Sequence, residues 1–593
     1  MAVTNHLSAI LGLDIGGINT RVSLMGIADG KYRVLGSQRT ATSLGQGLHI
    51  GAGVGEAMQA VQQETGHPFI KEEGGLLQPV DRIGRGVDRV GMVLSAGPRV
   101  RAALLGLTSQ GSIKSGQALF DSLPLQTSEN FGMAHLANTT RAVETLIKTR
   151  PDILVIAGGE DAGGEDLTMR WIDIVCILCQ MLPEAVQPLV VYAGSPGLEG
   201  AARRWLEPVA RLQVVPNVQP VFGEYDLVPA AGDLEQEILH KWQAGLPGLK
   251  GLSELTHGLT GLSARSMDRM VRFLSLTRGP VQGQPGKTGI LAVDLGGIFT
   301  TVAAGIGGQS GTVVDDKFPE IGSSALHSAS LATTTWAGEP VTEAESERFL
   351  TNHALIPAWV PETGLELALS HAFTRYRLQQ TLQRLSEHYD WFDFHPEYGL
   401  KGTFEPVIVS GAVITGTRDA ARVMLTLLDG LQPHGITTLV LDRNNILPLL
   451  GKIGEVEPVL PVQVLSSSAF ENLGTVISVS GRVPSNGTVI TVHMETASGK
   501  KSSHFVPSGS LLRLAVAEGE RAELELIPHN RVDIGFGGPG QRGRLRVTGG
   551  ILGVVIDARG RPLLLPEHTD ARVALLQTWL RALRAEHNST TGV

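Results

Sequence analysis

The chain has 593 residues, 49 Lys and Arg against 58 Asp and Glu, a formal net charge of −9, and only two cysteines. This length predicts two to four domains, and the acidic balance offers no basic field for a polyanion, so we expect no nucleic-acid partner. The two cysteines argue against a disulfide framework and suit a reducing compartment. Without a basic leader or a run of about 18 apolar residues, the sequence predicts a cytoplasmic protein with no membrane partner.

The first distinctive segment is LGLDIGGINTRVSLMG at 11–26, an apolar run, a Gly-Gly turn and a second apolar run. We interpret residues 9–26 as a strand, a tight turn and a strand. The pattern returns as ILAVDLGGIFTTVAAG at 290–305. The repetition therefore predicts two similar hairpins, each opening a lobe of its own.

Between the hairpins, apolar strand runs alternate with helical patterns from about 151 to 245. This order predicts a parallel sheet with crossover helices. Cys176 and Cys179 lie in one of these helical runs, where buried core thiols are the favoured interpretation. GGEDAGGED at 158–166 ends a predicted strand, and we favour an acidic helix cap there over a ligand site.

A Gly/Pro-rich link at 277–289 leads into the second hairpin and predicts a boundary between lobes. FEPVIVSGAVIT at 404–415 reads as a strand that ends in a glycine turn. A helix should follow it, with Thr417 as candidate N-cap and Asp419 in the first turn. GITTLVL at 435–441 predicts one further strand.

After about residue 474 the sequence changes to short alternating strands, which predict a separate β-rich domain closed by an amphipathic helix at 570–586. SNG at 485–487 is typical of a hairpin turn. Three arginines share one strand face, which we interpret as solvated rather than as an anion site: Arg542, Arg544 and Arg546. A local ion pair is the simplest interpretation of another group: Asp557, Arg559 and Arg561.

The repeated pattern has a chemical use. Glycines after a buried strand let backbone N–H groups approach an anion, a Thr hydroxyl can donate to it, and the Asp can hold a hydrated Mg²⁺. One such loop is weak evidence, but two facing loops could grip the phosphates of a nucleotide from both sides. VIVSGAV, about 110 residues after the second loop, could then present its backbone to an adenosine.

The order of loop, loop, and strand-glycine-helix resembles the actin, Hsp70 and sugar kinase superfamily, through LDIGGINTRV at 13–22, VDLGGIFTTV at 293–302 and VIVSGAVITG at 407–416. Within it, the sequence is most similar to the MutL-type accessory protein of adenosylcobalamin-dependent glutamate mutase. LVIAGGEDAGG at 154–164 and VVYAG at 190–194 add to that likeness, which covers roughly residues 8–470.

The resemblance implies ATP and Mg²⁺ as cofactors, with Asp14 and Asp294 as the catalytic and metal-orienting carboxylates. The residues implied to contact phosphate are Gly16, Gly17 and Thr20 in the first loop and Gly296, Gly297 and Thr300 in the second. Gly411 is implied to let the chain pass close to the adenine or ribose.

Both loops depart from the family pattern. In the first, Gly17, Ile18 and Arg21 replace Ser, Thr and Lys. In the second, Ile298 and Phe299 replace small and hydroxyl residues, and Thr301 replaces an Asp. Loss of hydrogen-bond donors to the phosphates should lower the rate of ATP hydrolysis before it lowers the affinity for ATP. We therefore expect nucleotide binding with weak or absent hydrolysis.

The resulting prediction is an α/β protein with a two-lobe actin-like ATPase fold, an inserted Rossmann-like α/β subdomain and a C-terminal β-rich domain. The expected boundaries are 1–150, 151–277, 278–473 and 474–593. By resemblance its role is chaperone-like, with nucleotide-driven lobe closure acting on a protein client such as a cobalamin-dependent mutase. The alternatives are a non-catalytic scaffold with a vestigial nucleotide site, and a small-molecule kinase, for which the sequence offers no convincing catalytic carboxylate. The oligomeric state stays open.

Overall fold

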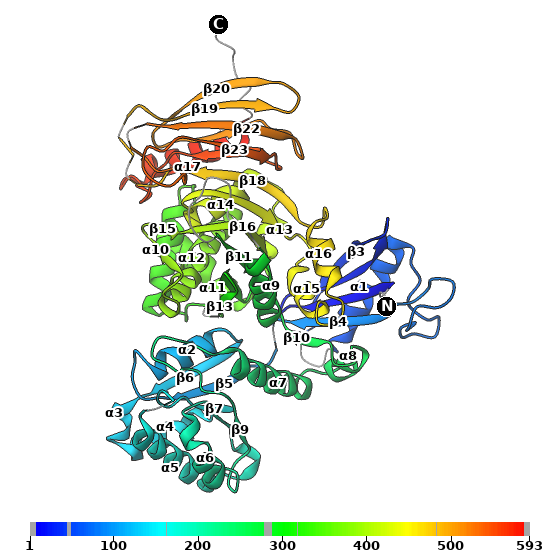
Figure 1. The fold of residues 1–593 in the computed structure, drawn as a ribbon, viewed down its shortest axis with the longest axis vertical. Helices are drawn as coiled ribbons and strands as arrows, with labels where there is room; N and C mark the ends of the chain where they lie inside the picture. The colour runs from blue at the N-terminus through cyan, green and yellow to red at the C-terminus, as the bar shows by residue number, and fades with distance from the viewer. Residues whose placement is uncertain are drawn as a thin grey trace. The chain divides into compact units, whose positions relative to one another are not determined.

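The computed structural model describes residues 8–43, 49–95, 97–161, 163–277, 288–316, 318–481, 483–484, 486–529 and 531–585. The chain divides into two compact units (Figure 1). The first comprises Met1–Thr42, Gly53–Val93 and Ser266–Val593, and the second comprises Ser43–Ala52 and Leu94–Arg265. Most of the predicted link at 277–289 lies outside the described residues. Among those described, no helix has the length and apolar character to cross a membrane.

The first hairpin has formed as predicted. β1 (Ala9–Ile15) is buried along its whole length and pairs antiparallel with β2 (Asn19–Ala28), with Asp14 opposite Arg21. β3 (Lys31–Ala41) and β4 (Arg89–Leu94) complete the order β4-β1-β2-β3, and α1 spans Gly51–Thr65. We call this sheet the first lobe.

The second hairpin begins a sheet that repeats this order. β11 (Thr288–Leu295), β12 (Thr300–Ile306) and β13 (Gln309–Asp315) are followed by β16 (Thr403–Ser410) and β17 (Gly435–Leu441), in the order β13-β12-β11-β16-β17. β13, β12, β11 and β16 thus hold the places of β3, β2, β1 and β4. β16 runs parallel to β11 and β17 parallel to β16. The repeated sequence therefore marks a repeated sheet, which we call the second lobe, and the predicted two-lobe α/β fold is confirmed.

Helices of the second lobe follow from strong local signals. α11 (Glu343–Leu355) and α12 (Gly364–His388) each begin with a capping box, set by Thr342 with Glu345 and by Thr363 with Glu366. The other elements are α10 (Ser324–Trp336), β14 (Asp393–His395), β15 (Gly399–Lys401), α13 (Ala412–Gly416), α14 (Ala420–Leu431), α15 (Leu447–Ile453) and α16 (Val459–Leu465).

One predicted cap is wrong. Asp419, not Thr417, is the N-cap of α14, because its carboxylate accepts a hydrogen bond from the backbone N–H of Arg422. The Thr417 hydroxyl instead donates to the carbonyl oxygen of Val413 and lies 2.9 Å from Nε2 of His371.

The C-terminal β-rich region is not separate from the second lobe. β18 (Glu471–Ser478), β24 (Val554–Asp557) and β21 (Leu511–Leu514) extend its sheet in the order β17-β18-β24-β21. A second sheet of order β20-β19-β22-β23 packs on them through a shared apolar core. Its strands are β19 (Thr488–Thr496), β20 (Lys501–Pro507), β22 (Arg521–Pro528) and β23 (Gly543–Thr548), and α17 (Thr569–Arg584) ends the region.

The predicted SNG hairpin is also wrong. β18 pairs with β17 and β24, while β19 pairs with β20 and β22, so the strands on either side of the turn belong to different sheets. Ser485 itself lies outside the described residues. Cross-strand pairing with distant partners prevails over the local turn signal.

The second unit contains the predicted parallel sheet, in the order β6-β5-β7-β8-β9. Its strands are β5 (Val100–Leu105), β6 (Leu125–Phe131), β7 (Ile153–Ile156), β8 (Leu189–Tyr192) and β9 (Leu212–Val214). The sheet therefore starts near residue 100 and not at 151, because the short run VRAALL pairs with β7 in its centre. Cys179 is buried in the core of this unit and Cys176 is half-buried.

The other elements listed along residues 112–277 are mainly helical. They are α2 (Ser112–Asp121), α3 (Met133–Leu136), α4 (Thr139–Thr149), α5 (Glu165–Met181), α6 (Glu199–Leu206), α7 (Val228–Gly245), α8 (Leu249–Leu255), β10 (Thr260–Leu262) and α9 (Ser263–Thr277), with short 3₁₀ turns at Glu184–Val186 and Pro196–Leu198. Of these, α2 to α6 lie between successive strands and supply the crossovers that parallel strands require.

Candidate functional site

Three aspartates of the first unit lie at strand ends and influence one another. Asp14 is the next-to-last residue of β1, Asp294 holds the matching place in β11, and Asp442 follows β17 directly. Asp14 is 6% exposed and Asp442 is fully buried. The Asp14 charge raises the pKa of both other carboxyls, so the three groups share one electrostatic site that spans both lobes.

Of the three aspartates, Asp442 is held by two backbone hydrogen bonds to its carboxylate. Its Oδ1 accepts from the backbone N–H of Ile446 at 3.0 Å, and its Oδ2 accepts from that of Leu447 at 2.8 Å. Burial raises its pKa to about 6, and those two hydrogen bonds oppose the rise. Asp442 therefore fixes the start of α15 and places its charge at the strand edge.

Asp14 is held from the other lobe. Asn445 Nδ2 donates to Asp14 Oδ2 at 2.9 Å, while Asp14 Oδ1 is buried and has no protein partner. Burial raises the pKa of this carboxyl, with Arg21 and the Asn445 hydrogen bond acting against the rise. An unsatisfied carboxylate oxygen in a buried site is a natural ligand for a cation or an ordered water.

The pKa of Asp294 lies near neutrality. Burial and then the charges of Asp14 and Asp442 raise it to about 7, and Arg21 and Arg377 oppose the rise. A positive charge brought into the site would favour the ionised form of all three carboxyls.

Hydroxyl groups hold the first loop in place. The Thr42 hydroxyl donates to Gly16 O at 2.8 Å, and its oxygen lies 2.9 Å from Thr20 Oγ1. Thr20 is fully buried, so this predicted phosphate ligand is engaged in supporting the loop. Gly16 and Gly17, by contrast, are half-buried.

A buried cation holds the second loop. Arg377 of α12 donates through Nη1 to Gly296 O at 3.0 Å and through Nη2 to Ile298 O at 2.7 Å. Thr300 is fully buried, and its Oγ1 has no protein partner. A Cβ at Gly296 would lie 2.7 Å from Phe299 O, which explains the glycine.

The two predicted loops meet through a hydrophobic residue. A Cβ built on Gly297 would lie only 2.2 Å from Cδ1 of Ile18. Ile18 stands where the family pattern has a hydroxyl residue, so an apolar side chain packs against the opposite loop at the position where a donor is expected.

Gly411 lies where β16 passes into α13. Its φ is +108°, and a Cβ there would lie 2.2 Å from Leu295 O at the end of β11. Close approach of two backbones thus requires a glycine here, while its contact with an adenosine stays a prediction.

The donor set fits a hydrated divalent cation. Carboxylate oxygens are the ligands Mg²⁺ prefers, and Mg²⁺ is commonly held by one or two carboxylates together with waters and substrate phosphates. Among the residues that the structure describes, no group of three or more His, Cys, Asp or Glu forms a ready ligand cluster. Asp14 and Asp294 would therefore hold the ion with waters and phosphate completing its shell.

Sequence reasoning missed Asp442, Asn445 and Arg377. Asp442 had a visible signal, because an Asp directly after an apolar strand and five residues before a helix can accept from the free backbone N–H groups at the start of that helix. Asn445 and Arg377 had none, since their partners lie more than 70 positions away in the chain.

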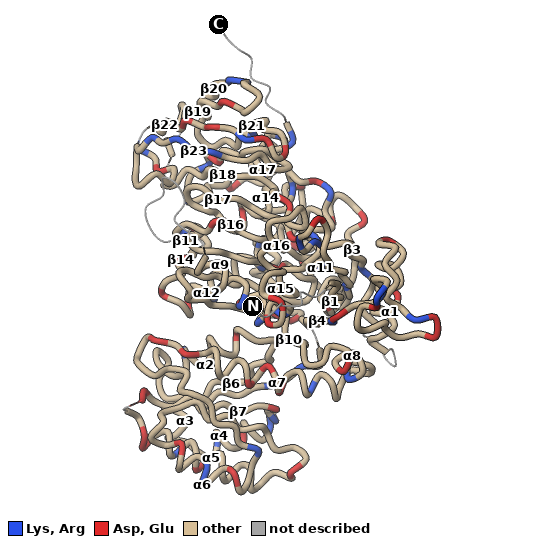
Figure 2. Tube along the Cα trace, turned by 45° about the vertical axis from the view of Figure 1, so that its right-hand side comes forward, with Lys and Arg blue, Asp and Glu red and all other residues tan. Residues whose placement is uncertain are grey.

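The other charged segments have structural roles. Asp161 Oδ1 accepts from Asn217 Nδ2 at 2.9 Å, and Glu165 and Asp166 lie in the first turn of α5, whose N-cap is Gly164 and has no side-chain cap hydrogen bond. Arg544 and Arg546 are exposed and lie 3.8 and 3.7 Å from the Glu523 carboxylate on β22. Lys and Arg positions are interspersed with Asp and Glu positions over the described chain (Figure 2).

A family model matches most of the chain. The model of the family described as MutL protein matches residues 10–469. The chain belongs to the MutL protein family. The match ends just before β18, so the β-rich C-terminal region lies outside it. No curated protein matches the sequence.

Solved structures similar to this MutL-family chain are distant. Xylulose kinase from Bifidobacterium adolescentis is 12% identical over 76% of this chain and 93% of its own, with a TM-score of 0.26. Gluconate kinase from Lactobacillus acidophilus is 8% identical over 76% and 90%, with a TM-score of 0.27. The Aquifex aeolicus PPX-GPPA enzyme is 12% identical over 77% and 82%, with a TM-score of 0.18. At such TM-scores these likenesses carry no weight for the site.

Proposed function

We propose that this protein binds ATP with Mg²⁺ at the two hairpin loops of its first unit, and hydrolyses it weakly or not at all. The observation that carries the proposal is the convergence of Asp14, Asp294 and Asp442 at the ends of strands from both lobes. Burial raises the pKa of each carboxyl, and the Arg21 charge opposes each rise. Buried carboxylates that repel one another favour a cation between them.

The residues have distinct roles in this proposal. Asp14 and Asp294 hold the hydrated Mg²⁺, whose charge offsets that of the nucleotide phosphates. Backbone N–H groups at Gly17, Gly296 and Gly297 face the phosphates, whereas the Gly16 N–H donates to Asn19 O at 2.9 Å and shapes the turn, and Arg21 adds a positive charge. Gly411 lies beside the adenosine.

Three features favour binding over turnover. The hydroxyl of Thr20 is engaged with Thr42, and Ile18 contacts Gly297 where a donor is expected. Thr301, a residue without a charge, stands in place of an acid. Donors aimed at the charge that develops on a transferring phosphoryl group are a main source of rate, so their loss lowers the rate first.

The cellular role that family membership favours is chaperone-like. Binding of nucleotide would change the relative position of the lobes and so act on a protein client, such as a cobalamin-dependent mutase, in the cytoplasm. A non-catalytic scaffold is the second candidate, and the contact between Ile18 and Gly297 favours it, because packed loops leave less room for phosphate.

Calorimetry with ATP and ADP in the presence of Mg²⁺ tests the proposal. We expect micromolar binding by the wild type and a loss of at least about tenfold in the Asp14→Asn, Asp294→Asn double variant. Asp393→Asn is the matched control, because Asp393 is an exposed partner of Lys401 far along the chain from both loops. No binding by the wild type, together with ordered oligomers in solution, would establish the scaffold instead.

A further inference from the structure

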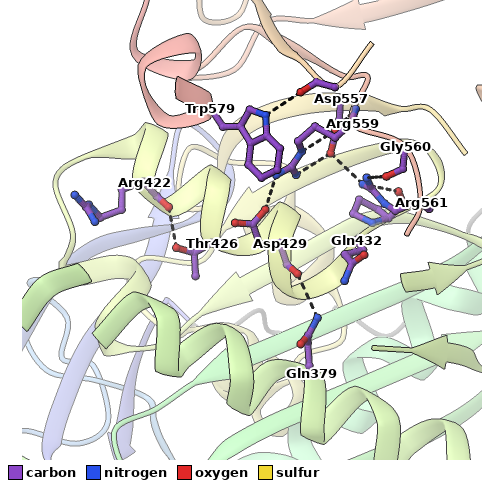
Figure 3. Close-up of polar contacts among 12 residues, drawn as sticks. Gln379, Arg422, Thr426, Asp429, Gln432, Asp557, Arg559, Gly560, Arg561 and Trp579 are labelled. Carbon is purple, nitrogen blue, oxygen red and sulfur yellow. Dashed lines mark hydrogen bonds and ion pairs between the residues drawn. The ribbon is translucent and has the colours of Figure 1, made fainter. Parts of the chain in front are cut away.

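A buried ionic network joins the second lobe to the C-terminal region. Arg559 donates through Nε and Nη2 to the two carboxylate oxygens of Asp557, each at 2.9 Å, and through Nη1 to Asp429 Oδ1 at 2.6 Å (Figure 3). Arg561 Nη2 donates to Asp557 Oδ2 at 3.0 Å. The Trp579 ring of α17 lies 4.6 Å from the Arg559 guanidinium. The expected local ion pair is therefore part of a larger network.

Arg375 of α12 belongs to the same electrostatic cluster but is poorly satisfied. It is 6% exposed, its Nε has no hydrogen-bond partner, and its guanidinium lies 3.4 Å from the centre of the Trp336 ring. Burial lowers its pKa to about 9, with Asp429 opposing the change and Arg559 adding to it. An arginine stays charged at neutral pH all the same.

The buried charges do not balance. Arg375, Arg559 and Arg561 are each at least nine-tenths buried, and so are two carboxylates, Asp429 and Asp557. Both carboxylates are hydrogen-bonded to Arg559, and Asp557 also to Arg561. One buried positive charge thus remains without an anion of its own, which is costly unless a partner is supplied.

Space for such a partner lies beside Arg375. A cavity of about 60 Å³, partly open to solvent, lies between α10, α12, α14 and α17. Its polar lining consists of Arg375, Arg422, Thr426, His371, Asp429, Gln577 and, at one side, Glu339. His371 is neutral, because burial lowers its pKa to about 3 and both ring nitrogens lie within 2.9 Å of threonine hydroxyls. The volume is enough for a few waters or one small ion.

We propose that this cavity binds a small oxyanion, of the size of phosphate, between Arg375 and Arg422. Arg375 supplies the buried charge and a free Nε donor, and Arg422, half-buried on α14, supplies the second cation. Asp429 does not repel the anion strongly, since its charge is neutralised by Arg559 at 2.6 Å. Glu339 also lines the cavity and favours the charged form of Arg422, so its carboxylate opposes the anion and competes with it for Arg422.

Because α17 lines the cavity, occupancy would fasten the C-terminal helix to the second lobe. This site is independent of the nucleotide loops, so failure of one proposal leaves the other intact. The two proposals are also tested with different ligands, inorganic anions for the cavity and ATP for the hairpin loops.

The test measures Tm of the full chain against phosphate, sulfate, acetate and chloride at fixed ionic strength. Phosphate and sulfate stabilise most proteins slightly by exclusion from the surface, so the quantity that counts is the difference between the wild type and variants. We expect a saturable rise with phosphate, and Arg422→Gln should raise the half-saturating concentration at least about tenfold. Arg581→Gln, on the exposed face of α17, is the matched control and should leave the response unchanged.

Arg375→Met gives a second, independent readout. In phosphate-free buffer this variant should be at least as stable as the wild type, because a long apolar side chain replaces an unbalanced buried charge, and it should not respond to phosphate. A response to acetate equal to that to phosphate would support the oxyanion site with a carboxylate as its ligand. An equal response to chloride, or equal responses in the wild type and Arg422→Gln, would overturn the proposal.

Discussion

The two hairpin loops share a backbone plan and differ in what holds them. The first loop is supported by neutral hydroxyls, with Thr42 bound to Gly16 O and beside Thr20. The second is supported by the buried Arg377, which donates to Gly296 O and Ile298 O. A duplicated strand-turn-strand unit therefore specifies where an aspartate stands, whereas its supports come from whichever element packs against it.

The aspartates differ in the same way. Asp14 has an amide partner in Asn445, while the pKa of Asp294 is raised to about 7 by burial and by the other two aspartates. One lobe thus brings a carboxylate with a fixed partner and the other brings a carboxylate near its titration point. A bound cation would act most strongly on the second.

The largest expected effect comes from removing the cation of the second loop. Arg377→Met leaves two loop carbonyls without donors and removes a charge that stabilises ionised Asp294, so we expect a loss of about 3 kcal/mol in the free energy of unfolding. Urea unfolding followed by circular dichroism measures it. Glu387→Gln on the same helix changes an exposed side chain that accepts a hydrogen bond from Gln383 Nε2, and it should cost less than about 1 kcal/mol. Equal losses would show that Arg377 does not support the loop.

The next effect concerns pH and Asp294. Its pKa is about 7 in the folded protein against 3.8 for the unperturbed group. The folded state therefore holds a proton that the unfolded chain releases, and stability falls as pH rises from about 4 through 7. The drop attributable to Asp294 should reach at most about 4 kcal/mol, from a rise in pKa from 3.8 to about 7 at about 1.4 kcal/mol for each unit.

Asp294→Asn should flatten this part of the stability profile. Urea unfolding at a series of pH values measures the slope, and Asp393→Asn on the exposed β14 is the control. If Asp294→Asn keeps the same slope of stability against pH as the wild type and Asp393→Asn, the rise in the pKa of Asp294 does not determine the profile. Mg²⁺ with ATP should raise the stability of the protein above pH 7, because the bound cation favours the ionised form of Asp294.

How far the sequence could predict this site depends on chain distance. The hairpins, the glycine turns and the aspartates at strand ends are local, so alternation of apolar residues and glycines predicts them. Asn445 and Arg377 act on loops that are 431 and 81 positions away, and only the sheet order and the packing of α12 bring them there. The extension of the second-lobe sheet through β18 and β24 is missed for the same reason, because it depends on pairing between strands about 80 residues apart.

The smallest expected effect comes from substituting Ile18, and its outcome decides between the two proposed functions. The side chain of Ile18 packs against Gly297 of the second loop. Ile18→Thr would remove that apolar contact and restore the hydroxyl that the family pattern has at this place. If the loops are a nucleotide site weakened by substitution, ATP should bind about tenfold tighter by calorimetry, near 1.4 kcal/mol.

If the loops instead serve assembly, the same change should leave nucleotide binding unaltered and lower the stability by about 1 kcal/mol through lost packing. Ile27→Thr, an exposed position of β2 that lies beyond the loop, controls for the general cost of the substitution. An increase in ATP affinity in Ile18→Thr but not in Ile27→Thr would mean that one side chain, and not the shared backbone plan, separates this chain from its nucleotide-binding relatives. An unchanged affinity in both would make the hairpins a means of joining the lobes.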